Sequence, residues 1–151
     1  MSNKPNAISK VLSPNDTGET GGHQAGICVP KGGEVLEFFP DLGNTEKNPR
    51  ATLFFTDESG KEWKFCFIYY NNKFFDAKGT RNEYRLTGMT AYFREHGLKA
   101  GDTITLSHQQ DGIDIIRYKR NIAPVVTESV EADGTKHRKL TIGSNWMVID
   151  Y

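Results

Sequence analysis

The chain has 151 residues, of which 36% are hydrophobic and 25% charged. This length is typical of a single domain, here residues 1–151, and the composition excludes a wholly disordered or collagen-like chain. Because 19 basic residues balance 19 acidic ones, we do not expect wholesale non-specific binding of polyanions. A nucleic-acid site would therefore need locally concentrated positive charge.

The amino-terminal half is predicted to form short strands separated by polar turns. Strand patterns cover residues 7–12, 26–30, 51–55 and 62–70. The last two flank a turn at residues 57–60 and form the clearest hairpin in the sequence. On its second strand, Trp63, Phe65, Phe67 and Tyr69 share one face. Residues 34–39 have apolar positions compatible with either a short helix or a strand.

The carboxy-terminal half continues this pattern of short strands. Further strands are expected at residues 81–87, 102–107, 112–119, 125–130, 139–142 and 146–149. Only residues 89–96 show clear helical spacing, with Gly97 placed as a C-cap. About eight or nine short strands with one clear helix predict a mainly β barrel or sandwich, rather than a doubly wound parallel sheet.

The cysteines and the amino terminus bear on the cellular compartment. Cys28 and Cys66 lie inside apolar runs, so we expect both to be buried thiols in a reducing, cytoplasmic environment. The sequence shows no secretory signal and no apolar segment long enough to span a membrane, so we expect no membrane partner. Cysteine and histidine spacings do not match a zinc site, and no phosphate-binding loop is found, so we expect no metal and no cofactor.

The most distinctive local feature is the segment 73–85, where four basic residues outnumber two acidic ones. Alternation along a strand places Arg81, Glu83 and Arg85 on one face. Arginine pairs with guanine through two hydrogen bonds, and glutamate accepts from the cytosine amino group. This row could therefore recognise successive base edges in a major groove. The alternative is a surface strand whose charges pair with one another.

Two other segments offer candidate functional residues. The polar, glycine-containing segment 13–24 has many donors and acceptors, although by itself a solvated loop is the better explanation. Asp41, followed by Glu62 and Lys64, fits a loose nuclease pattern, in which two carboxylates hold a divalent cation and a lysine lies near the attacking water. Such a pattern arises often by chance, and surface charges on a hairpin are the simpler interpretation.

Residues 12–26, 81–87 and 97–102 resemble the amino-terminal effector-binding domain of EcoRII-type restriction endonucleases. Residues 81–87 (RNEYRLT), followed by Phe93 and by residues 97–102 (GLKAGD), are also similar to the plant transcription-factor B-three domain. There an R-x-x-Y/F-x-L-T strand precedes a helix and a G-L-K-x-G-D turn. Residues 143–149 are similar to the last strand of the restriction-enzyme version.

The resemblance implies a seven-stranded open pseudobarrel with one or two short helices. Two segments would hold double-stranded DNA: the first arm, residues 15–24, and the second arm, residues 71–85. Carried over by position, His23, Arg81, Glu83 and Arg85 match DNA-contacting residues, and we expect phosphate contacts from Lys73 and Lys78. The complete set of expected contacts is Asn15, Asp16, Thr20, His23, Gln24, Lys73, Lys78, Arg81, Asn82, Glu83 and Arg85.

The resemblance also implies a role within a longer protein. Restriction-enzyme domains of this type recognise 5′-CC(A/T)GG, which suits a row of arginine and glutamate. Because no nuclease domain follows in this sequence, we expect a non-catalytic domain whose parent carries a separate carboxy-terminal nuclease domain, the part that would use Mg²⁺. The alternatives are a minimal Mg²⁺-dependent nuclease and a transcription-factor-like DNA-binding protein.

Overall fold

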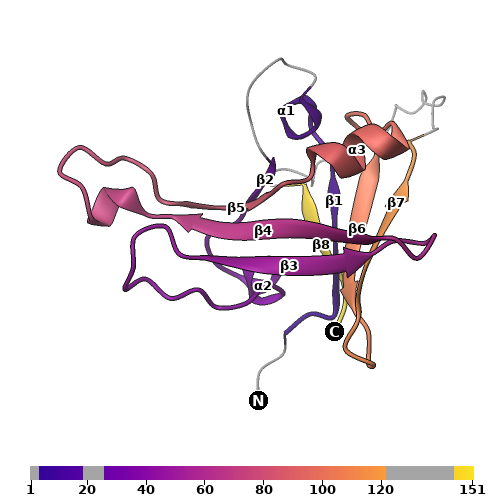
Figure 1. Ribbon diagram of the computed structural model, residues 1–151, viewed down its shortest axis with the longest axis horizontal. Helices are drawn as coiled ribbons and strands as arrows, with labels where there is room; N and C mark the ends of the chain where they lie inside the picture. Colours follow the sequence, from indigo (N-terminus) through magenta and orange to yellow (C-terminus); the bar gives the residue numbers. More distant parts are fainter. Residues whose placement is uncertain (1–3, 19–25, 122–144) are drawn as a thin grey trace, which may run out of the picture.

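Eight strands form one curled sheet in the computed structural model, which describes residues 4–18, 26–121 and 145–151 (Figure 1). The strands are β1 (Ala7–Val11), β2 (Gly26–Val29), β3 (Arg50–Thr56), β4 (Glu62–Tyr70), β5 (Glu83–Thr87), β6 (Thr103–His108), β7 (Asp114–Lys119) and β8 (Trp146–Asp150). The helices are α1 (Pro14–Thr17), α2 (Glu34–Glu37) and α3 (Thr90–His96), with one 3₁₀ turn, η1 (Asn72–Phe74).

The sheet has the order β2-β5-β4-β3-β7-β6-β1-β8 and consists of two four-stranded halves. Neighbouring strands within each half are antiparallel, and the halves are joined by a single parallel bridge between Thr56 of β3 and Ile115 of β7. Figure 1 shows the strands of one half crossing those of the other. On the open side, Trp146 Nε1 of β8 donates to the Cys28 carbonyl oxygen of β2 at 3.0 Å. The two edge strands are therefore joined by this side-chain hydrogen bond but are not paired as strands in the described sheet, so the barrel is open.

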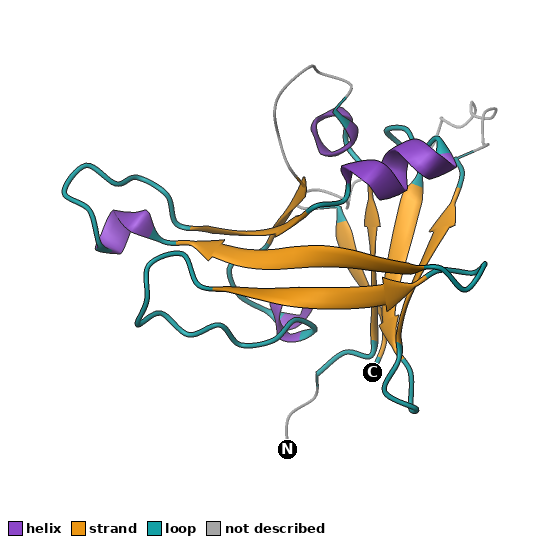
Figure 2. Cartoon of the chain, viewed as in Figure 1, coloured by secondary structure: helices purple, strands orange, loops and turns teal. Residues whose placement is uncertain are grey.

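The predicted mainly β open barrel is therefore confirmed, with two differences in the number of elements. The resemblance implied seven strands, whereas the described sheet has eight, because β8 adds to β1 as an edge strand. The described residues form three α-helices and a 3₁₀ turn, drawn in purple in Figure 2, rather than one or two helices. Two of the α-helices are single turns of four residues, α1 after Ser13 and α2 after Gly33, which is too short for periodicity to reveal.

The core lies inside the curl of the sheet, under α3. Trp63, Phe65 and Phe67 of β4 are all buried, as their shared face predicted. Tyr92 and Phe93 of α3 pack into the same cluster, and the Trp63 and Tyr92 rings meet edge to face at 5.2 Å between centroids. Burial of these large rings is the main source of stability in such a sheet.

The β3–β4 turn is organised by the buried carboxylate of Asp57. It accepts hydrogen bonds from the Ser59 amide at 2.9 Å, the Lys61 amide at 3.0 Å and Trp63 Nε1 at 2.8 Å. Burial alone would raise the pKa of Asp57, but the hydrogen bonds from Trp63, Ser59 and Lys61 outweigh burial and hold this pKa well below its usual range. Asp57 therefore stays ionised and ties the predicted hairpin turn to the core.

Some sequence-based expectations need correction or fall outside the described residues. Cys28 is exposed rather than buried, and Cys66 is half-buried, because both lie on the outer face of the sheet. For residues 34–39, where the sequence left a helix and a strand both open, the structure has the helix α2 directly after Gly33. The hairpin predicted at residues 125–130 and 139–142 lies outside the described residues. None of the described helices is long and apolar enough to cross a membrane.

Candidate nucleic-acid interface

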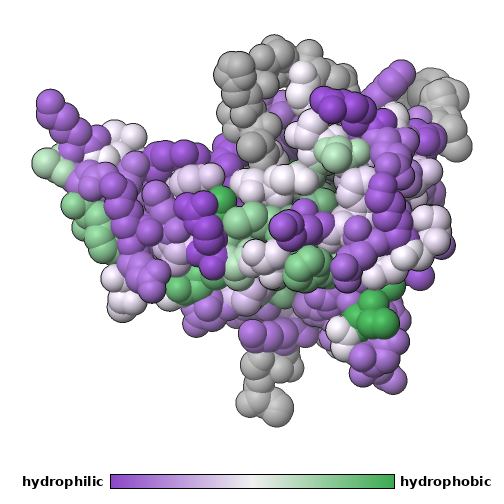
Figure 3. All heavy atoms as spheres, viewed as in Figure 1, coloured by the Kyte–Doolittle hydropathy of each residue, from purple (hydrophilic) through white to green (hydrophobic). Residues whose placement is uncertain are grey.

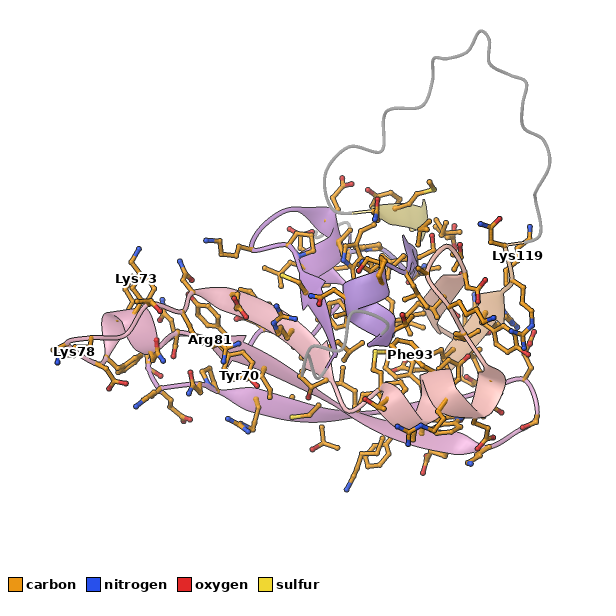
Figure 4. The ribbon with its side chains drawn as sticks, turned by 90° about the horizontal axis from the view of Figure 1, so that it is seen from above. Tyr70, Lys73, Lys78, Arg81, Phe93 and Lys119 are labelled. Atoms are coloured by element: carbon orange, nitrogen blue, oxygen red, sulfur yellow. The ribbon has the colours of Figure 1, made fainter. Side chains whose placement is uncertain are left out.

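The second arm extends the hairpin of β4 and β5 away from the rest of the sheet (Figure 4). Its backbone is fixed where the two sides meet: the Lys73 amide donates to the Arg81 carbonyl oxygen at 3.1 Å, and the Arg81 amide donates to Asn72 Oδ1 at 2.9 Å. Gly79 packs closely here, because a Cβ atom at that position would lie 2.1 Å from the Asn72 carbonyl oxygen. The arm is therefore an ordered projection.

The loop before β3 braces the base of the second arm. Asn48 and the fully buried Asn71 exchange hydrogen bonds, from the Asn48 amide to Asn71 Oδ1 at 2.7 Å and from the Asn71 amide to Asn48 Oδ1 at 3.1 Å. Further out, Lys47 Nζ lies 2.7 Å from Asp76 Oδ2. These contacts were not predicted, because a loop-to-loop pairing leaves no periodic pattern in the sequence.

Arg81, Glu83 and Arg85 form the charged row that alternation predicted. Glu83 Oε2 accepts from Arg81 Nη2 and from Arg85 Nε, both at 2.7 Å. Burial would raise the pKa of Glu83, but hydrogen bonds from Arg81 and Arg85, together with their charges, lower it overall. The side chains of Arg81, Glu83 and Arg85 are 43%, 31% and 18% exposed, so the row is reachable from solvent and ionised near neutral pH.

Two aromatic residues of β4, Tyr70 and Tyr69, contact Arg81 and Asn82 of the second arm. The sequence analysis predicted a functional role for neither. The guanidinium carbon of Arg81 lies 3.8 Å from the centre of the Tyr70 ring (Figure 4). Tyr70 is directly opposite Glu83 in the register of β4 and β5, so it lies on the same face of the sheet. Asn82, an expected DNA contact, accepts a 2.8 Å hydrogen bond at Oδ1 from the Tyr69 hydroxyl.

The end of the second arm is cationic. Lys73 and Lys78 are both exposed, and Lys73 Nζ lies 5.9 Å from the centre of the Phe74 ring. The one acidic residue of this turn, Asp76, is paired with Lys47. The positive charges at the end of the arm are therefore not cancelled locally.

The first arm is described only up to Gly18. Asp16 and Ser13 form a capping box around α1, and Lys10 Nζ binds Asp16 Oδ2 at 2.6 Å, with the two side chains 6% and 10% exposed. Asn15 is exposed on the same helix, which contacts β2. The arrangement makes Asp16 a structural anchor of this arm. The expected contacts Thr20, His23 and Gln24 lie outside the described residues.

The nuclease-like residues are not brought together. Asp41 lines a cavity with Tyr84, and burial, Tyr69 and the Asp41 charge raise the pKa of Tyr84. Tyr84 is opposite Tyr69 on β4, seven residues from Glu62 on that strand, a separation of about 23 Å. Two carboxylates bound to one cation lie within about 5 Å of each other. Asp41 and Glu62 therefore cannot share a metal ion, and within the described ranges no cluster of three potential metal ligands occurs.

Residues 3–99 match the family described as restriction endonuclease EcoRII, N-terminal. The chain is 41% identical over 90 residues to the type II restriction enzyme EcoRII of Escherichia coli, covering 56% of this chain and 22% of the enzyme. It is 32% identical over 116 residues to a B3 domain-containing transcription repressor of Arabidopsis thaliana, covering 77% of this chain and 13% of the repressor.

The fold has a counterpart among solved structures. The Arabidopsis FUS3–DNA complex contains a chain that matches with a TM-score of 0.56 and 21% identity, over 74% of this chain and 94% of that one. The two curated relatives are much longer proteins, of which the chain spans 22% and 13%. The family match over residues 3–99, the relatives and the open barrel agree with the resemblance found in the sequence. The chain belongs to the EcoRII N-terminal family, whose fold it shares with plant B3 domains.

Proposed function

We propose that this chain is a sequence-specific domain that binds double-stranded DNA and holds it between its two arms. The family membership supports this proposal, since its relatives include a restriction enzyme and a transcription repressor. The observation that carries the proposal is the row of Arg81, Glu83 and Arg85 on one face of a projecting, ordered arm.

The chemistry of this row suits base edges in the major groove. Arg85 donates from Nε to Glu83. The two terminal nitrogens of Arg85, Nη1 and Nη2, form no hydrogen bond with any described residue. Such a pair matches the O6 and N7 acceptors of guanine. Glu83 uses Oε2 for both arginines, which leaves Oε1 to accept from a cytosine amino group. The row thus favours adjacent G·C pairs, and we propose a CC(A/T)GG-like site.

Other residues would fix the position of the duplex rather than its sequence. Lys73 and Lys78 are exposed at the end of the second arm and suit phosphate contacts. In the first arm we propose contacts from Asn15, Thr20, His23 and Gln24. Asp16 and Asn82 are held by protein partners, so we propose that they shape the two arms beside the DNA.

We propose that the domain itself is non-catalytic and requires no metal or other cofactor for binding. The separation of Asp41 from Glu62 argues against a minimal nuclease. In the parent protein, cleavage would belong to a separate nuclease domain with its own Mg²⁺, as the similarity to a much longer restriction enzyme suggests.

Binding-site selection from random duplexes, followed by competition binding, tests the proposal. We expect one enriched sequence, and Arg81→Ala should lose about 1–3 kcal/mol on it while relaxing the choice at one base pair. Arg94→Ala is the matched control, because Arg94 is an exposed arginine of α3 that belongs to neither arm. Failure to enrich any sequence, or equal losses for Arg81→Ala on selected and scrambled duplexes, would contradict the proposal.

A further inference from the structure

The end of the second arm carries two exposed aromatic side chains that the charged row does not explain. Phe74 and Phe75 are 61% and 43% exposed, among the most exposed large hydrophobic residues of the described chain. Figure 3 shows apolar atoms at this projecting end, surrounded by hydrophilic surface. Two adjacent exposed phenylalanines on a projection are a costly arrangement unless a ligand covers them.

The backbone that carries these rings forms an ordered turn. The Phe74 amide donates to the Asn71 carbonyl oxygen at 3.0 Å, and the Phe75 amide donates to the Asn72 carbonyl oxygen at 3.1 Å. Asn71 is fully buried and bonded to Asn48. The backbone that presents the two rings is thus attached to the body of the protein, so little conformational entropy would be lost when a ligand covers them.

The register of the arm places this apolar end next to the charged row. Because the Lys73 amide bonds the Arg81 carbonyl oxygen at 3.1 Å, Phe74 follows directly after the residue opposite Arg81. Phe74 is the last residue of the 3₁₀ turn η1, which rises about 2.0 Å per residue, so Phe74 and Phe75 lie about 2–4 Å beyond Lys73, close to the roughly 3.4 Å between base pairs. If Arg81 contacts one base pair, Phe74 and Phe75 lie over the next one or two pairs outward.

The charges around the rings favour the same ligand. Lys73 and Lys78 flank the two phenylalanines, while Asp76 is paired with Lys47. An apolar surface flanked by cations matches an apolar group that lies between phosphates. In the major groove, the 5-methyl group of a pyrimidine is the apolar group that the base edges present, and phenylalanine is one of the side chains that contact it.

We propose that Phe74 and Phe75 form a subsite for the 5-methyl group of a pyrimidine, thymine or 5-methylcytosine, one or two base pairs outward from the pair contacted by Arg81. This inference rests on the proposed function and extends it to a base that the charged row does not reach. It makes the end of the second arm a determinant of specificity rather than only a site of phosphate contact.

Duplexes that differ by one methyl group test the subsite. In the selected site, thymine is placed on either strand at each of the two flanking pairs and replaced by deoxyuridine, which lacks only the methyl group. For the wild-type protein, we expect this replacement at one position to weaken binding about threefold to fourfold, the effect of one buried methyl group. In the Phe74→Ala/Phe75→Ala variant, thymine and deoxyuridine duplexes should bind equally.

Phe54→Ala is the matched control, because Phe54 is 49% exposed on β3, opposite Lys64 and away from the arm. It should keep the full effect of the methyl group. The proposal is overturned if deoxyuridine has no effect at any flanking position, or if the double variant keeps the wild-type preference. If either happens while Arg81→Ala still relaxes specificity, the subsite alone fails. If the wild-type protein selects no sequence, the proposed function fails as well.

Discussion

Replacing Glu83 by glutamine separates recognition by the charged row from its structural role. The substitution keeps the shape of the side chain but removes the charge that binds Arg81 and Arg85 at 2.7 Å each. Because Glu83 is 31% exposed, these ion pairs are screened by solvent, and the free energy of unfolding should fall by no more than about 1 kcal/mol. Binding of the selected duplex should fall more, by about 1–3 kcal/mol or roughly fivefold to 150-fold, because the acceptor for cytosine is altered.

Scrambled duplexes should respond in the opposite direction. Removing one negative charge from a surface that faces phosphates raises non-specific affinity slightly, so the ratio of selected to scrambled affinity should fall further than the selected affinity itself. Fluorescence anisotropy with both duplexes at two salt concentrations measures this ratio, and urea denaturation measures the stability. Equal changes on both duplexes would refute the argument, since they would show that Glu83 does not contact a base.

Three further predictions concern residues around the interface and the core. Tyr70→Leu removes the ring beneath Arg81 and should weaken selected binding about twofold to fivefold; Tyr70→Phe should bind like the wild type, and equal effects of the two variants in competition assays would contradict a positioning role. Asp16→Ala leaves Lys10 buried without its partner and should lower the free energy of unfolding by about 3–5 kcal/mol. A urea titration that shows a loss as small as that for an exposed residue would contradict the importance of the buried ion pair. The pKa of Asp57 is lowered in the folded protein, so its contribution to stability is complete above the unfolded pKa of about 3.9 and is lost as pH falls below it. Asp57→Asn should therefore be less stable at neutral pH and show a weaker decline in acid, and an unchanged decline in pH-dependent denaturation would exclude this assignment.

The sequence predicted the parts of the fold that depend on alternation. The buried face of Trp63, Phe65 and Phe67 and the outward row from Arg81 to Arg85 follow from the two-residue period of a strand. Residues 34–39 stayed ambiguous because a one-turn helix and a short strand bury similar positions. Cys28 was wrongly expected to be buried, since its apolar neighbours do not show which face of β2 is outward.

The parts of the site that could not be predicted depend on contacts between distant segments. The stacking of Tyr70 on Arg81 and the pairing of Asn48 with Asn71 depend on how the second arm folds back. The sequence alone does not show whether a charged side chain contacts a ligand or another residue of the same protein. Asp16 illustrates this: the Ser13–Asp16 spacing fits a capping box, but its ion pair with Lys10 appears only in three dimensions.

The central claim is that bases are contacted from the face of β5 that carries Glu83 and Arg85. Titrating the labelled protein with its selected duplex and following side-chain and amide NMR signals tests it most directly. We predict large shifts for Arg81, Glu83, Arg85 and the rest of the second arm, and none for the β6–β7 turn, residues 109–113, where those strands end. Shifts concentrated at that turn, with the guanidinium signals of Arg81 and Arg85 unchanged, would contradict the claim.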